Sequence, residues 1–160
     1  MRKLTLLLMI FGLLVVGCDN DSGSDDASDA DALIGTWAVS GLTDASGDRS
    51  GGLLASYNSV LITIGSNSSV SMNVDAKDPV PDLNADGTYT LNESTKTLIA
   101  TLSVSGQPTP LTFTYGFQGE SGLKLTPVGS TTILLGVLFQ TSYEDPVEFT
   151  FTNCPLDCRV

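Results

Sequence analysis

The segment DLNADGTYTLNE, residues 82–93, has the residue types and the spacing of a calcium-binding loop. In an EF-hand, oxygens of Asp82, Asn84 and Asp86 would occupy the first, third and fifth ligand positions. Glu93 would then close the site as a bidentate carboxylate. These side chains could therefore bind a hard divalent cation through their carboxylate and amide oxygens.

The sequence on either side of this segment favours a turn instead. An EF-hand needs a helix on each side of its loop, whereas DAKDPVP, with two prolines, precedes this segment and the strand-like TLIATLSV follows it. Residues 88–92 already alternate as a strand does, which at about 3.3 Å per residue carries Glu93 roughly 20 Å from Gly87. Because Asp86-Gly87 suits a tight turn, we predict a hairpin or loop without a metal. A calcium site at the same three side chains, completed by another ligand, is the alternative.

Catalytic chemistry has few candidates elsewhere in the chain. The sequence contains no histidine, which excludes Ser-His and Cys-His catalysis and the common zinc sites. Its formal net charge is −11, with 18 acidic against 7 basic residues, and such a surface repels nucleic acid. We therefore expect a protein that is not an enzyme, needs no cofactor and binds no nucleic acid.

The chain begins with the features of a secretory signal. A basic start, Arg2-Lys3, precedes an apolar run over residues 4–16, and the small residue Gly17 stands at the expected cleavage point. The apolar run is too short to span a bilayer comfortably as a permanent helix. We therefore expect residues 1–17 to be a signal peptide that is removed.

Val15-Val16-Gly17-Cys18 resembles the lipobox of bacterial lipoproteins. The resemblance implies that Cys18 becomes the first residue and carries a diacylglycerol on its sulfur and a further acyl chain, such as palmitate, on its amine. Two or more chains, at about 0.8 kcal/mol per buried methylene, anchor a protein stably in a lipid bilayer. The protein would then belong to the bacterial cell envelope, held to the inner or the outer membrane, with its domain in the periplasm or at the cell surface. An ordinary cleaved signal with a chance cysteine is the alternative.

Two short segments flank the predicted domain. Residues 18–32 are predicted to be the lipidated cysteine and a disordered tether, because a stretch with six aspartates and no basic residue cannot bury enough apolar surface to become ordered. Residues 154–160 are a tail in which Cys154 and Cys158 are predicted to form a disulfide, as nearby cysteines do outside the cytosol. A redox or metal-binding pair is the alternative.

Alternation of apolar and polar residues dominates most of the chain and indicates antiparallel strands with one buried face. In VSMNV, for example, Val70, Met72 and Val74 share one face, while Ser71 and Asn73 share the other. No stretch after the tether shows a sustained helical period. Short polar turns between the strands predict an all-β fold, in which an antiparallel up-and-down meander closes into a barrel. A β-sandwich is the alternative.

LIGTWAVSG, residues 33–41, resembles the opening strand of lipocalin-like, calycin-type proteins, with Gly35 and Trp37 in the G-x-W positions. The resemblance covers most of residues 33–153 and implies a barrel of about eight strands, with Trp37 packed across its closed end. Many such proteins end the last strand with an arginine that lies over this tryptophan, whereas Asn153 stands here. The closed end is therefore expected to be built differently.

Two segments depart from the strand pattern. Residues 131–139, TTILLGVLF, are strongly apolar without alternation, and we predict a strand buried on both sides or a segment that plugs the barrel. A hydrophobic flap beside a ligand mouth or against lipid is the alternative. Residues 41–52, GLTDASGDRSGG, are predicted to be a flexible connection, either slack chain or a lid over the barrel mouth.

A barrel of eight strands either fills its interior with side chains or holds one small ligand. We predict that this barrel binds a small hydrophobic molecule in a cavity whose walls include Trp37, Ile62, Met72, Leu102, Phe113, Tyr115 and Phe149. The alternative is a filled barrel, a structural or interaction module that docks an envelope protein through its outer surface or through residues 131–139.

Overall fold

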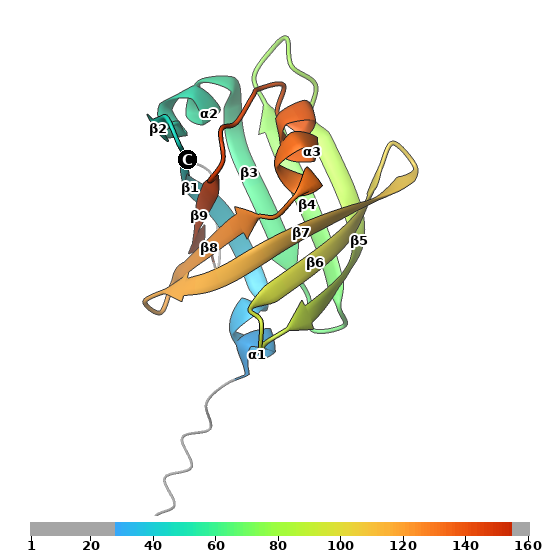
Figure 1. Cartoon of the computed structure of the whole chain (residues 1–160). Helices are drawn as coiled ribbons and strands as arrows, with labels where there is room; N and C mark the ends of the chain where they lie inside the picture. Colours follow the sequence, from blue (N-terminus) through green and yellow to red (C-terminus); the bar gives the residue numbers. More distant parts are fainter. Residues whose placement is uncertain (1–27, 155–160) are drawn as a thin grey trace, which may run out of the picture.

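Eight antiparallel strands close into a barrel in the computed structural model, which describes residues 28–154 (Figure 1). The barrel strands follow one another in chain order: β1 (Gly35–Asp44), β3 (Tyr57–Ile64), β4 (Ser69–Ala76), β5 (Leu83–Asn92), β6 (Thr97–Val104), β7 (Gln107–Gln118), β8 (Gly122–Pro127) and β9 (Glu148–Asn153). β9 pairs with both β8 and β1, which closes the sheet. The short β2 (Gly47–Asp48) pairs with the end of β1. The predicted all-β, up-and-down barrel is confirmed, and the sandwich alternative is excluded.

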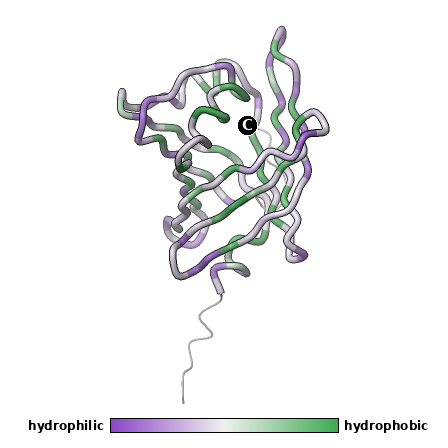
Figure 2. Tube along the Cα trace, turned by 45° about the vertical axis from the view of Figure 1, so that its right-hand side comes forward, coloured by the Kyte–Doolittle hydropathy of each residue, from purple (hydrophilic) through white to green (hydrophobic). Residues whose placement is uncertain are grey.

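The core lies inside the barrel because the strands alternate as the sequence predicts. Met72, Leu98 and Leu125 point inward and keep at most 5% of their surface exposed, while Asn73 next to Met72 is exposed. Figure 2 shows hydrophobic stretches along the strands and hydrophilic ones in the loops at either end. An antiparallel sheet with one buried face produces this pattern.

Three short helices occur where the sequence predicts none: α1 (Asp29–Leu33), α2 (Ser50–Ser56) and α3 (Ser130–Leu138). No sustained helical period indicated them, and they span only 5, 7 and 9 residues. α1 lies in the predicted tether, and its Leu33 is fully buried in the core. The predicted flexible connection 41–52 is instead the end of β1, the hairpin to β2 and the start of α2. Among the described residues, no helix is long and apolar enough to cross a bilayer.

α3 corrects one prediction for residues 131–139 and confirms another. The segment is a helix, so the predicted strand buried on both sides is wrong, whereas the predicted plug is confirmed. Leu135, on one side of the helix, is 4% exposed and faces the barrel interior, while Ile133 and Val137 are 71% exposed. Because apolar residues lie on both the inner and the outer side, the segment shows no amphipathic period in the sequence.

The helices cover opposite ends of the barrel (Figure 1). We call one the α1 end; it also holds the connections after β3, β5 and β7, because antiparallel strands reverse direction at every turn. The other, which we call the α3 end, holds α2 and α3. At the α1 end the backbone N–H of Cys154 donates to the carbonyl oxygen of Thr36 at 2.8 Å. The first and last described residues therefore lie at the same end.

Candidate functional site

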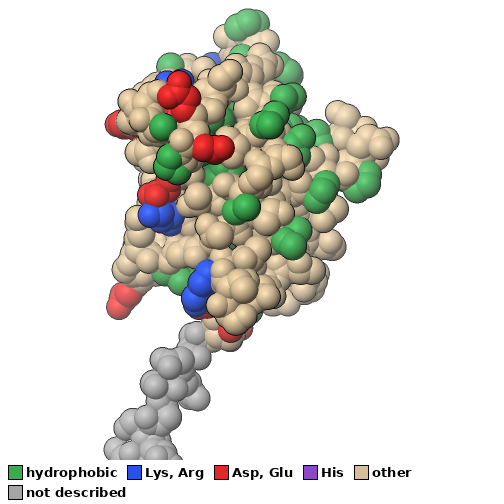
Figure 3. Space-filling view, in the orientation of Figure 1, with side chains coloured by type: hydrophobic (Ala, Val, Ile, Leu, Met, Phe, Trp, Pro, Cys, Tyr) green, Lys and Arg blue, Asp and Glu red, His purple; other side chains and the backbone are tan. Residues whose placement is uncertain are grey.

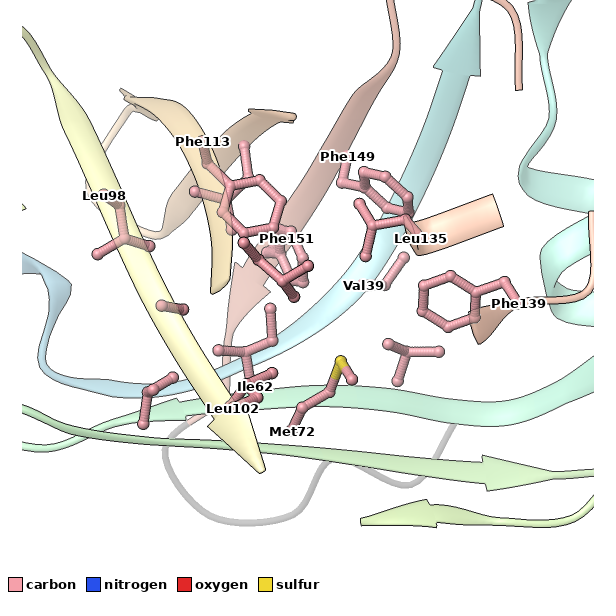
Figure 4. A pocket seen from close by; sticks show the side chains of 15 residues that line it. Val39, Ile62, Met72, Leu98, Leu102, Phe113, Leu135, Phe139, Phe149 and Phe151 are labelled. Carbon is pink, nitrogen blue, oxygen red and sulfur yellow. The ribbon is translucent and has the colours of Figure 1, made fainter. Parts of the chain in front are cut away.

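The barrel encloses an apolar cavity of about 40 Å³ (Figure 4). It is lined by Val39, Val60, Ile62, Val70, Met72, Leu98, Ala100, Leu102, Leu111, Phe113, Leu125, Leu135, Phe139, Phe149 and Phe151. All of these side chains are hydrocarbon or thioether, so a ligand inside would meet no hydrogen-bonding side chain. A cavity of this kind suits an apolar molecule, and apolar cavities stay dry.

The structure brings together five of the seven residues predicted to line a cavity. These are Ile62, Met72, Leu102, Phe113 and Phe149. They could be found from the sequence because each occupies an inward position of an alternating strand.

Ten further lining residues were not named as walls: eight lie on strands, whereas Leu135 in α3 and Phe139 directly after it follow no strand alternation. These last two enter the barrel from its α3 end. The Phe139 ring packs edge-on against the Tyr57 ring with 5.5 Å between ring centroids, and lies 6.2 Å from the Phe149 ring. The Tyr57 hydroxyl also donates to the carbonyl oxygen of Phe139 at 3.0 Å. α3 is thus a plug held by aromatic contacts and one buried hydrogen bond.

The remaining predicted wall residues, Trp37 and Tyr115, do not line the cavity. Trp37 is 1% exposed, and its indole N–H donates to the carbonyl oxygen of Leu33 in α1 at 2.8 Å. In the sheet it stands opposite Ile62 on β3 and Asn153 on β9. The short helix α1, joined to the tryptophan by this hydrogen bond, is the feature that covers the α1 end.

Tyr115 belongs to a polar cluster that holds α1 to the barrel. Its hydroxyl donates to Oδ2 of Asp29 at 2.6 Å, and the Lys96 ammonium contacts the same carboxylate. The hydrogen bond from Lys96, and next that from Tyr115, lowers the pKa of Asp29. Burial, and next the hydrogen bond to Asp29, raises the pKa of Tyr115. Tyr115 therefore stays protonated as a donor and serves as an attachment point rather than a cavity wall.

Residues 82–93 form neither a calcium loop nor the predicted hairpin, because residues 83–92 are the central strand β5. The amide of Asn73 on β4 donates to the Asn84 side chain opposite it, and Asp82 Oδ1 accepts from the backbone N–H of Ala76 at 2.8 Å. Asp86 stands opposite Ser71, two residue pairs further along the same two strands. Glu93 accepts from the backbone N–H of Ala30 at the α1 end. These side chains are spread along a strand and do not converge.

No group of three or more His, Cys, Asp or Glu side chains that could hold a metal ion occurs among residues 28–154. The cysteine predictions fall largely beyond this range. The signal peptide 1–17, Cys18 and Cys158 lie outside the described residues, as does the tether up to residue 27. The disulfide between Cys154 and Cys158 and the lipidation of Cys18 therefore stay predictions.

Comparisons with known proteins do not assign the chain to a family. No protein-family model matches the chain, and no curated protein matches it either. Inferences about function therefore rest on the geometry of the barrel and on the sequence.

Proposed function

We propose that the chain is a lipid-anchored lipoprotein of the bacterial cell envelope whose lipocalin-like barrel binds a small hydrophobic molecule beneath α3. The observation that carries the binding proposal is the wholly apolar cavity, which Leu135 of α3 and Phe139 directly after it line at the α3 end. The signal sequence and the lipobox-like Val15-Val16-Gly17-Cys18 support the anchor.

The size of the cavity constrains how a ligand enters. Drug-sized ligands occupy pockets of about 300–1,000 Å³, whereas this cavity measures about 40 Å³. A ligand larger than a few heavy atoms therefore has to displace Leu135 and Phe139. α3 is the element suited to such a movement, because it is not part of the sheet and packs on the barrel through side chains.

A substitution that fills the cavity tests the proposal. Ala100 lines the cavity and is 4% exposed, so Ala100→Leu should lower the affinity for an apolar fluorescent probe such as N-phenyl-1-naphthylamine by at least about tenfold, or 1.4 kcal/mol. Ala55→Leu, at an exposed position of α2, is the matched control and should leave the affinity unchanged. Binding is measured by fluorescence titration of residues 19–160, which include every described strand and helix.

Circular dichroism before titration checks that Ala100→Leu still folds, since overpacking costs about 1–3 kcal/mol. Equal probe affinity in the unaltered protein and in a folded Ala100→Leu variant would contradict binding inside the barrel. No probe binding by the unaltered protein would contradict the binding proposal altogether.

The anchor is tested separately with Cys18→Ser in the full chain. Without the thiol there is no acceptor for the diacylglycerol, so the variant should lose metabolic labelling with a palmitate analogue and accumulate in uncleaved or soluble form. The measurement is membrane fractionation together with the mass of the N-terminus. Unchanged labelling and fractionation would show that Cys18 is not the lipidated residue.

A filled barrel that docks another envelope protein is a second candidate. It is favoured by the small cavity and by Ile133 and Val137, whose side chains are 71% exposed on the outer side of α3. Figure 3 shows hydrophobic side chains gathered on the part of the surface that carries α3, with most charged ones on the opposite side of the view. This candidate would fit if the unaltered protein binds no apolar probe. It would also require that Ile133→Ser abolishes the binding of a partner protein.

A further inference from the structure

A second pocket, of about 170 Å³, lies beside the apolar cavity at the α3 end. We call it the α2–α3 pocket. Phe139 is among its apolar lining residues, and its polar ones are Arg49, Ser56, Tyr57, Gln140, Thr141 and Tyr143. It therefore differs from the barrel interior, because several of its walls can form hydrogen bonds.

Tyr143 lines this pocket, and its hydroxyl is an unused hydrogen-bonding group that neighbouring side chains cover. Its hydroxyl oxygen is buried and has no hydrogen-bond partner among residues 28–154. Burial raises the pKa of Tyr143, so the hydroxyl keeps its proton and remains a donor. A buried polar group left without a partner lowers the stability of the folded protein. A ligand atom that accepts this hydrogen bond would remove that cost.

Arg49 adds further donors, but its charge is already balanced. Its Nε lies 3.7 Å from Oδ2 of Asp44, whose carboxylate is fully buried, and its side chain is 41% exposed. The other guanidinium donors make no hydrogen bond within the described part of the chain. Two further acidic residues belong to the same segments: the backbone N–H of Glu144 donates to Oδ2 of Asp44 at 3.4 Å, and Asp48 directly precedes Arg49 in the sequence.

These charges select the kind of ligand group the pocket accepts. The buried Asp44 carboxylate already pairs with the Arg49 guanidinium, and Glu144 and Asp48 add negative charge on neighbouring residues, so an anionic group would find no unbalanced positive charge here. A neutral hydroxyl or carbonyl oxygen would instead accept from Tyr143 and from the free Arg49 donors without adding charge. The pocket is therefore suited to an uncharged polar group.

Phe139 connects the polar pocket to the apolar cavity. It is the one described residue that lines both, so we place its ring between them. A ligand that moves this ring aside would have a hydrocarbon-lined space on one side and hydrogen-bond donors on the other. This arrangement matches a molecule with one apolar chain and one polar head.

We propose that the α2–α3 pocket binds the polar head of an uncharged amphiphile, a single-chain molecule with a hydroxyl or carbonyl head, whose alkyl chain enters the barrel past Phe139. This inference rests on the proposed function, since the chain needs the apolar cavity. It adds the class of ligand and a specificity-determining hydroxyl, that of Tyr143.

The test compares three molecules with the same chain length but different heads: octan-1-ol, octanoate and octane. Each competes with N-phenyl-1-naphthylamine for residues 19–160, and we expect octan-1-ol to bind more tightly than octane or octanoate. Tyr143→Phe removes one hydrogen bond of about 1 kcal/mol, which corresponds to about a fivefold loss of octan-1-ol affinity. The affinity for the probe, which has no such head, should not change.

Tyr89→Phe is the matched control, because the Tyr89 hydroxyl donates to the carbonyl oxygen of Gly65, a residue of the β3–β4 connection at the other end of the barrel. If Tyr143→Phe and the unaltered protein bind octan-1-ol equally well, the inference is overturned. The pocket would then hold water only. Tighter binding of octanoate would overturn the choice of an uncharged head. In both cases the probe would still bind and the proposed function would stand, whereas loss of all binding would overturn the proposed function itself.

Discussion

Replacing Trp37 with alanine is expected to lower the free energy of unfolding by about 3–5 kcal/mol. The side chain is 1% exposed, so its removal leaves a cavity at the α1 end of the core. The carbonyl oxygen of Leu33 would also lose the indole N–H, which donates to it at 2.8 Å. Leu33 is itself fully buried, so α1 should detach from the barrel more readily in this variant.

The measurement is urea denaturation followed by far-ultraviolet circular dichroism, because Trp37 is the only tryptophan and its fluorescence is lost with it. Trp37→Phe is the graded comparison. It keeps an aromatic ring in the core but leaves the Leu33 carbonyl without its donor, which costs about 1–3 kcal/mol. A loss below about 1 kcal/mol for Trp37→Ala would show that the tryptophan does not hold the α1 end together.

Gly87→Ala should destabilise the barrel by about 1–3 kcal/mol, the usual range for overpacking. Gly87 lies inside β5, and an added Cβ would collide with the carbonyl oxygen of Thr101 on β6. It would also lie 2.8 Å from the carbonyl carbon of Thr101 and 2.9 Å from the Cα of Leu102. These are backbone atoms, so relief requires the two strands to move apart.

Gly116→Ala is the control, because Gly116 is also inside a strand, β7, but an added Cβ there meets no atom within 4 Å. We expect this variant to match the unaltered protein or to be slightly more stable, since alanine reduces the entropy of the unfolded chain. Thermal and urea unfolding of both variants give the comparison. Equal stability of the two would contradict close contact between β5 and β6 at Gly87.

Gly87 also explains why the prediction for residues 82–93 failed. Asp86-Gly87 is turn-favouring when only neighbouring residues are considered. In the barrel, Gly87 pairs with Val70 on β4 and Leu102 on β6, and its missing side chain lets β5 approach β6 closely. Glycine inside a strand often marks such an approach. The pairing partners are distant in the chain, so local turn chemistry could not predict them.

The same difference between local pattern and tertiary contact explains which cavity residues were predicted. Ile62, Met72 and Phe149 were predicted because strand alternation is a property of adjacent residues. Trp37 and Tyr115 have the same alternation but lie towards the α1 end, where they bond to α1 instead. Alternation shows which face of a strand is buried, whereas the position along the barrel axis depends on which elements cover each end.

The sequence by itself determined the all-β class and the inward faces of most strands, because period-two alternation and turn residues act locally. It also determined the lack of histidine and the acidic charge that limit the chemistry. Only the tertiary structure decided that residues 130–138 form a helix that plugs the α3 end, and that Phe139 separates an apolar cavity from a polar pocket. These features arise because closure of the sheet brings α2, α3 and the β1–β2 hairpin together at the α3 end. No pattern of neighbouring residues predicts contacts between segments so far apart in the chain.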